Sequence, residues 1–234
     1  MQGSIYNKVM KIALFVFIAL QLLLFPQIQL TTAYVSRISS YCAIALVVLF
    51  AFLCYRGLSG AWFIRVGLVF TLVADTFLLL CKDADLHGVL TFIVVQMAYF
   101  VYLVVSEEHS TLRHANILTR LIISLILLMV VFAVLGDGAD TLSIASVIYY
   151  GNLVTNTVFA FARGRKERWF AWGLLLFCMC DLCIGFETLF SSYLGSNALD
   201  FFYSDTLNLP WVFYHPSQVL IGISLYFQAT KGAE

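Results

Sequence analysis

The sequence predicts an all-α fold, a polytopic membrane protein with eight transmembrane helices. Of its 234 residues, 62% are hydrophobic and only 11% are charged, and the mean hydropathy is +0.95. Soluble domains average about 45–50% apolar and about 25% charged residues. Apolar runs long enough to cross a hydrocarbon core of roughly 30 Å follow one another along the whole chain. This composition excludes a soluble enzyme that is merely anchored to a membrane.

The predicted elements are apolar runs that end at charged or turn-forming residues. The first run is too long for a signal-peptide core and no small-residue cleavage site follows it, so we expect a retained helix. The eighth contains Pro216, which locally frees backbone carbonyl groups. The runs form one predicted membrane domain, residues 1–234, with spans at about residues 10–30, 39–55, 62–81, 88–105, 119–135, 141–162, 169–190 and 210–229.

Basic residues are divided unequally between the two ends of the predicted bundle. Of the 13 Lys and Arg residues, only Arg37 and Lys82 fall at one end. The remainder, including Arg113 and Arg120, falls at the end that holds both termini. The positive-inside rule then predicts cytoplasmic termini. This orientation fits a plasma (inner) membrane or an endomembrane, and we expect the plasma membrane. The net charge of zero gives no reason to expect a nucleic-acid partner.

Two aspartates lie in the middle of apolar runs, Asp75 in the third run and Asp181 in the seventh. A carboxylate at that depth costs about 2.5–3.5 kcal/mol on insertion scales, so such a residue usually faces a bundle interior or a wet cavity. Two close carboxylates in a low dielectric do not both ionise, which leaves one as an acid and the other as a base. We therefore predict one shared polar site that contains both aspartates.

Each aspartate belongs to a stripe of small residues on one helix face. Gly67 precedes Asp75 by eight residues, and Gly173 precedes Asp181 by eight. Positions at this spacing lie near the same face of a helix. The glycines, with Gly185 one turn beyond Asp181, are expected to let neighbouring helices come close. The match suggests a parallel 4+4 repeat, in which the first four spans correspond to the last four.

Further polar side chains fall inside neighbouring spans and are predicted to line the same pocket. Asn152 and Asn156 could instead join helices by hydrogen bonds, and His215 has no second histidine in a span with which to bind a metal. The cysteines of the CMCDLC segment are interpreted as packing residues, with no metal and no disulfide framework. The candidate substrate-binding residues are Gln96, Tyr99, Asn152, Tyr214, His215 and Gln218.

Four segments resemble, in order, the motifs of the YhhN family: GLVFTLVADTFLLL, TFIVVQMAYFVYL, GLLLFCMCDLCIGF and VFYHPSQVLIGIS. These proteins are membrane lysoplasmalogenases related to the eukaryotic transmembrane protein 86 group. The resemblance implies an eight-span bundle and assigns family positions to Asp75, Asp181 and the pairs Gln96–Tyr99 and Tyr214–Gln218. The chain departs from the usual motif residues at Thr71, Ala74, Gln96 and Cys180.

The resemblance implies hydrolysis of the vinyl ether bond of a lysoplasmalogen, which yields a fatty aldehyde and a glycerophospho-alcohol. A vinyl ether is cleaved when its β-carbon is protonated and water attacks the resulting oxocarbenium ion. Asp75 and Asp181 would share the catalytic roles, as two carboxyl groups do in glycoside hydrolysis. The apolar bundle would hold the alkenyl chain of this lysophospholipid, and the wet outer or interfacial end its head group. No metal or organic cofactor is expected.

Two other classes of function remain open on the residues alone. Intramembrane carboxylates and parallel repeats also suit a proton-coupled carrier for a small molecule or a lipid. Pro216 weighs against a carrier, because the fourth span has no proline to match it. The second alternative is a non-catalytic membrane protein that binds lipid, and it predicts that both Asp→Asn changes are tolerated.

Overall fold

The computed structural model describes residues 2–54, 60–107, 109–194 and 208–231, and every regular element in these ranges is helical. Each of the eight predicted spans corresponds to one helix, in chain order. A π-helical turn, η1 (Thr76–Leu80), continues the third helix. The helices are α1 (Gln2–Leu30), α2 (Ala33–Leu53), α3 (Ala61–Asp75), α4 (Asp85–Val105), α5 (Ser110–Leu135), α6 (Thr141–Ala162), α7 (Arg168–Leu194) and α8 (Leu209–Lys231).

Seven of these helices, α1 to α7, are long and apolar enough to cross a membrane, as a multi-pass membrane protein requires. The eighth, α8, has 23 residues and is less apolar. Its polar side chains are buried in the bundle, among them Ser217, Gln218 and Gln228, because α8 packs against α1, α2, α3 and α7. The lower hydropathy of α8 therefore follows from its place among other helices.

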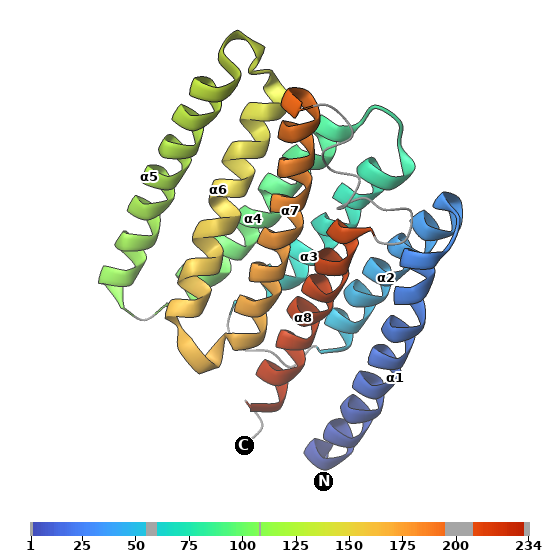
Figure 1. Ribbon diagram of the computed structural model, residues 1–234. Helices are drawn as coiled ribbons and strands as arrows, with labels where there is room; N and C mark the ends of the chain where they lie inside the picture. The colour runs from blue at the N-terminus through green and yellow to red at the C-terminus, as the bar shows by residue number, and fades with distance from the viewer. Residues whose placement is uncertain (1, 55–59, 108, 195–207, 232–234) are drawn as a thin grey trace.

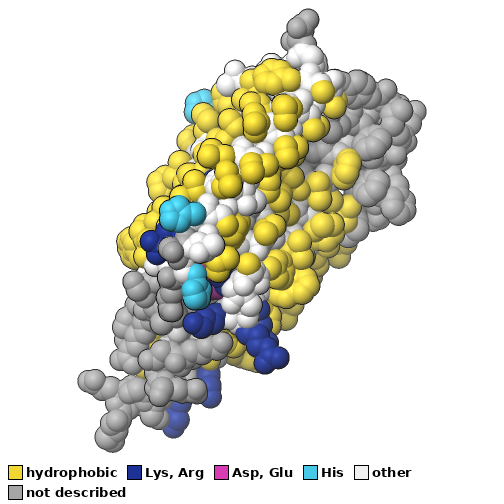
Figure 2. All heavy atoms as spheres, turned by 90° about the vertical axis from the view of Figure 1, so that its left-hand side faces the viewer, with side chains coloured by type: hydrophobic (Ala, Val, Ile, Leu, Met, Phe, Trp, Pro, Cys, Tyr) yellow, Lys and Arg dark blue, Asp and Glu magenta, His cyan; other side chains and the backbone are white. Residues whose placement is uncertain are grey.

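The helices run up and down one long axis, and both termini lie at the same end of the bundle (Figure 1). Opposite edges are formed by α1 and α5 (Figure 1). The face over α5 is dominated by hydrophobic side chains, with Lys and Arg gathered toward the end of the termini (Figure 2). That end, which holds Lys8, Arg113 and Arg163, is the basic end of the bundle.

Two glycines of the predicted stripes allow close contact between helices. A Cβ atom on Gly67 would lie 2.3 Å from Cε1 of Tyr99, so the Tyr99 ring packs on α3 only because Gly67 has no side chain. A Cβ atom on Gly173 would lie 2.9 Å from the carbonyl oxygen of Ser217 in α8. The predicted close approach is confirmed at these positions. It is not found at Gly185, where no atom of the described residues lies within 4 Å of the corresponding point.

Candidate functional site

Asp75 is the last residue of α3, where the helix passes into the π-helical turn η1. Its side chain is only 3% exposed. The hydroxyl of Tyr214 in α8 lies 2.9 Å from Oδ1 and 2.8 Å from Oδ2 of Asp75 and donates a hydrogen bond to the carboxyl group. Single π turns inside helices frequently mark functional sites. The turn and the buried carboxyl group coincide here.

Asp181 in α7 has a tyrosine partner from a different helix. The hydroxyl of Tyr149 in α6 donates a hydrogen bond of 2.6 Å to Oδ2 of Asp181. Tyr149 is buried, whereas Asp181 is only partly buried. Tyr149 is absent from the predicted set of site residues. A tyrosine in an apolar helix gives no sequence signal that distinguishes pairing with a carboxyl group from ordinary packing.

An aromatic layer separates the two tyrosine–aspartate pairs. The ring of Phe177 lies 5.3 Å from that of Tyr214 and 6.2 Å from that of Tyr149, measured between centroids. Phe92 of α4 lies 5.5 Å from both Tyr149 and Phe177. Cys180 lies within electrostatic range of both carboxyl groups. The structure thus brings the two aspartates to one region, each bonded to its own tyrosine.

Two predicted residues next to this region carry buried polar atoms that have no hydrogen-bond partner in the described chain. They are Nε2 of Gln96 and Oε1 of Gln218. Both side chains are fully buried, as is that of Tyr99. A buried polar group without a partner usually indicates a bound water or ligand, because leaving it unpaired costs about 1–3 kcal/mol. These atoms supply both donors and acceptors for such a molecule.

Asn152 lies on a second polar cluster, one helical turn from Tyr149 along α6. Its Oδ1 accepts a hydrogen bond from Arg120 of α5, and Asn156 accepts another at 2.7 Å. Asn156 in turn donates to Oε1 of Gln96 at 2.9 Å. The sequence predicts a fifth span that begins at about residue 119, which puts Arg120 at its end, whereas α5 begins at Ser110 and the arginine lies buried within it.

His215 points away from the two carboxyl groups, although it follows Tyr214 directly. Its Nε2 lies 2.7 Å from Oε1 of Gln21 in α1, and its ring lies 5.5 Å from that of Phe25. Successive helical residues point about 100° apart, which explains why neighbours contact different helices. The hydrogen bond between His215 and Gln21 joins α8 to α1. In the described ranges, no three His, Cys, Asp or Glu side chains converge as metal ligands.

The basic end holds the ion pairs of the described chain. Arg163 lies 3.2 Å from Glu107 and 3.8 Å from Glu167. Partial burial alone would raise the pKa of Glu107. Hydrogen bonds from the backbone N–H of His109 and from Arg163 lower the pKa by more than burial raises it, so the pKa of this carboxyl lies below its usual range. The hydroxyl of Tyr102 donates to Glu167 at 2.6 Å. This network joins α4 to the segment between α6 and α7 at the basic end.

A model of the YhhN family matches residues 32–225, from the residue before α2 into α8. The matched segment contains both aspartates and both of their tyrosine partners. No curated protein and no solved structure matches the chain.

Proposed function

The chain belongs to the YhhN family, and we propose that it is a membrane hydrolase that cleaves the vinyl ether bond of lysoplasmalogens. The observation that carries this proposal is the arrangement of Asp75 and Asp181 about one aromatic layer, each bonded to a tyrosine hydroxyl. Vinyl ether hydrolysis needs a proton donor and a base near an apolar chain. The bundle interior offers both.

The enclosed Asp75 is the proton donor in this proposal. It transfers its proton to the β-carbon of the double bond, and the carboxylate that remains balances the charge of the oxocarbenium ion. The partly exposed Asp181 removes a proton from the water that attacks the α-carbon. The hemiacetal then loses its hydroxyl proton to Asp75, and Asp181 returns its proton to the departing glycerol oxygen. The products are an aldehyde and an alcohol, and both carboxyl groups regain their starting states.

The remaining site residues bind the substrate or position the two carboxyl groups in this proposal. Tyr214 and Tyr149 hold the two carboxyl groups through their hydroxyls. Gln96 and Gln218 place their unpartnered polar atoms, and Tyr99 its hydroxyl, toward water or the oxygens of the substrate. His215 fixes α8 against α1 and acts on the site only through the helix.

We further propose that all eight helices cross the plasma membrane with the basic end in the cytoplasm. The distribution of Lys and Arg supports this orientation. A parallel 4+4 repeat is supported by equivalent packed pairs: α1–α2 with α5–α6, α3–α4 with α7–α8, and α2–α8 with α4–α6. The tyrosine partners depart from the repeat, because one comes from α8 and the other from α6.

The test is aldehyde release by purified protein in neutral detergent from lysoplasmalogens with choline or ethanolamine head groups. Wild type is expected to release aldehyde, and Asp75→Asn and Asp181→Asn each to lose about 10²-fold or more while staying monodisperse. Asp85→Asn is the matched control, because Asp85 is exposed at the start of α4. In D2O the aldehyde is expected to gain one deuterium at the carbon beside the carbonyl.

Full activity in either folded Asn variant would contradict the two-carboxylate mechanism. If folded wild type releases no aldehyde from either head group, the hydrolase proposal fails. Uptake by proteoliposomes along a pH gradient then tests the carrier alternative.

A further inference from the structure

Arg120 is a buried cation whose hydrogen-bond acceptors are all neutral. It is 8% exposed and lies in α5 against α6. It donates to Oδ1 of Asn152, to Oδ1 of Asn156 at 2.7 Å and to Oδ1 of Asn116 at 3.2 Å. Its guanidinium lies 4.2 Å from the ring centroid of Phe100. With Gln96, which is bonded to Asn156, these residues form the Arg120 cluster: Gln96, Asn116, Arg120, Asn152 and Asn156.

The charge of Arg120 is not balanced within the described chain. Both ion pairs found there belong to Arg163. A buried charge without a counter-charge is costly. Arg65, another buried arginine, differs because it donates to the carbonyl oxygens of Ala51 and Cys54 at the end of α2, where the helix dipole is negative.

The Arg120 cluster also retains unused hydrogen-bond donors. Nε of Arg120 and Nε2 of Gln96 are buried and have no acceptor in the described chain. A guanidinium matches phosphate oxygens in geometry and charge. Arg120 is therefore a cation with unused hydrogen-bond donors among neutral amide side chains, an arrangement that suits the binding of one anionic group.

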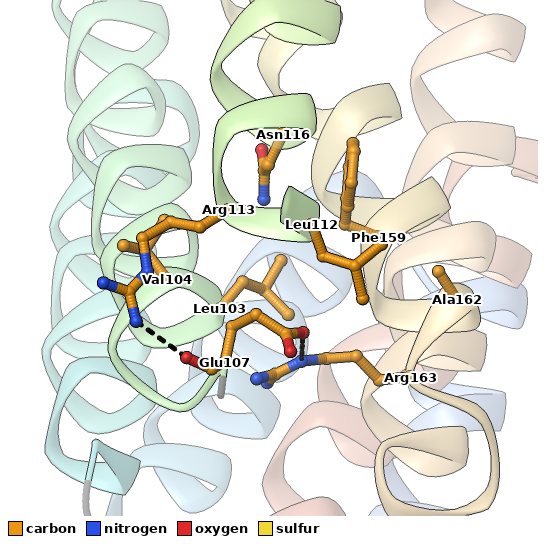
Figure 3. A pocket seen from close by; sticks show the side chains of 9 residues that line it. All are labelled: Leu103, Val104, Glu107, Leu112, Arg113, Asn116, Phe159, Ala162 and Arg163. Atoms are coloured by element: carbon orange, nitrogen blue, oxygen red, sulfur yellow. Dashed lines mark hydrogen bonds and ion pairs between the residues drawn. The ribbon is translucent and has the colours of Figure 1, made fainter. Parts of the chain in front are cut away.

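A small hollow between α4, α5 and α6 at the basic end meets the Arg120 cluster at Asn116, which belongs to both. Figure 3 shows Asn116 together with the side chains of Arg113 and Arg163. The other lining side chains are Glu107, which lies 3.2 Å from Arg163, and five apolar residues. With two arginines and one glutamate, the lining carries a net positive charge, which favours an anion.

The depth of the cluster agrees with the dimensions of the proposed substrate. Asn152 and Asn156 follow Tyr149 on α6 by three and seven residues, or about 4.5 and 10.5 Å along the axis at 1.5 Å per residue. Both lie nearer the basic end. In a lysoplasmalogen about six bonds separate the vinyl carbon from phosphorus, roughly 7 Å when extended. A vinyl ether beside Tyr149 and Asp181 therefore places phosphorus at the level of Arg120.

We propose that the Arg120 cluster binds the phosphate group of a single-chain phospholipid, with Arg120 as counter-ion and Gln96 as an additional donor. This inference rests on the proposed function for the identity of the lipid. It directs the head group toward the basic end, opposite to the outer end that the sequence suggested. The substrate is then taken from the leaflet at the basic end.

Binding without turnover tests the site directly. The probe is a 1-O-alkyl lysophosphatidylcholine, which lacks the vinyl bond, compared with 1-O-alkyl glycerol, which also lacks phosphate. The phosphate-bearing probe is expected to raise the Tm of wild type more than alkyl glycerol does. Asn152→Asp supplies an internal carboxylate beside Arg120 at nearly unchanged shape, so the difference between the probes is expected to disappear. Arg120→Gln is the second variant, with the same expected loss.

The control is Asn208→Asp, the same change at an exposed residue before α8, and it is expected to keep the difference between the probes. Equal shifts from both probes in wild type, or an undiminished difference in Asn152→Asp, would overturn the proposal. Inorganic phosphate alone is the remaining arm. A Tm shift as large as that from the lipid would overturn the assignment to a lipid head group.

Turnover separates failure of this site from failure of the proposed function. With lysoplasmalogen, Asn152→Asp is expected to raise KM about tenfold or more relative to wild type, whereas the control Asn208→Asp is expected to leave KM unchanged. If wild type releases no aldehyde but Asn152→Asp abolishes the phosphate-dependent Tm shift, the hydrolase fails and the anion site stands. If wild type releases aldehyde and Asn152→Asp leaves KM unchanged, the hydrolase stands and the anion site fails.

Discussion

Replacing Gly67 with Ala places a methyl group where the ring of Tyr99 lies. The added Cβ would lie 2.3 Å from Cε1 and 2.9 Å from Cδ1 of that ring, whereas carbon atoms pack at about 3.5–4.0 Å. The ring would have to move by more than about 1 Å by the same contact distance. It has little room to do so, because Tyr99 is fully buried and meets Phe170 edge-on at 5.3 Å.

Overpacking of this kind costs about 1–3 kcal/mol. At about 2–4 °C per kcal/mol for a chain of this size, a cost of about 2 kcal/mol lowers Tm by about 4–8 °C. The assay is size-exclusion chromatography of detergent-solubilised protein after heating. Gly185→Ala is the matched control, because no atom of the described residues lies within 4 Å of its Cβ position. There the change is expected to stabilise by about 0.5–1 kcal/mol.

The reasoning would be refuted by a Gly67→Ala protein as stable as wild type, or by equal losses in the two variants. A double variant gives a sharper check. Tyr99→Leu removes the ring atoms that the methyl group meets, so Gly67→Ala is expected to cost less in that background than in wild type.

Three further outcomes are expected. Tyr214→Phe leaves the enclosed Asp75 without its hydrogen-bond donor and is expected to lower the stability of the fold by about 1–3 kcal/mol. Tyr149→Phe is expected to lower it less, because the carboxyl partner of Tyr149 is partly exposed. Equal losses in Tm would contradict this order. Cys81 is exposed and directly follows η1, the continuation of α3. Because α3 is the third helix of the up-and-down bundle, Cys81 is expected at the end opposite the N-terminus, so a membrane-impermeant maleimide is expected to label it in intact cells. Labelling only after lysis would reverse the proposed orientation. The pKa of Glu107 is lowered in the folded chain, so its stabilising contribution is present above the usual pKa of about 4.3 and is lost as pH falls through the folded value. Glu107→Gln is therefore expected to have a lower Tm than wild type at pH 7, and this difference is expected to vanish in acid. A Tm difference that does not depend on pH would contradict this expectation.

The features that the sequence predicts correctly are those with a large local cost or gain in free energy. Long apolar runs locate the helices, because the chain needs about 20 such residues to cross a bilayer. Asp75 and Asp181 stand out for the opposite reason, since a carboxyl group in an apolar run is expensive unless it is partnered. Gly67 and Gly173 follow from their spacing relative to these aspartates.

The pairings between helices could not be predicted in the same way. Tyr149 has no local feature that marks it as the partner of Asp181. The sequence pattern starts the fifth span at about residue 119, next to Arg120, because charges usually bound an apolar run, but α5 begins earlier, at Ser110. Glu167 lies in the charged segment GRKER and is nevertheless buried, because Tyr102 and Gln228 from distant helices bond to it. Only tertiary packing decides such cases.

The separation of Arg120 from the two aspartates bears on the proposed chemistry. In the described chain the hydrogen-bond partners of Asp75 and Asp181 are tyrosine hydroxyls, and no ion pair reaches either carboxyl group. A tyrosine hydroxyl can donate to a carboxyl group in either protonation state, whereas an adjacent arginine would hold the carboxyl in its charged form. A proton donor to carbon must be able to exist protonated. A cation that recognises phosphate must therefore stand apart from the acid, and one to two turns of α6 provide that distance between Tyr149 and the Arg120 cluster.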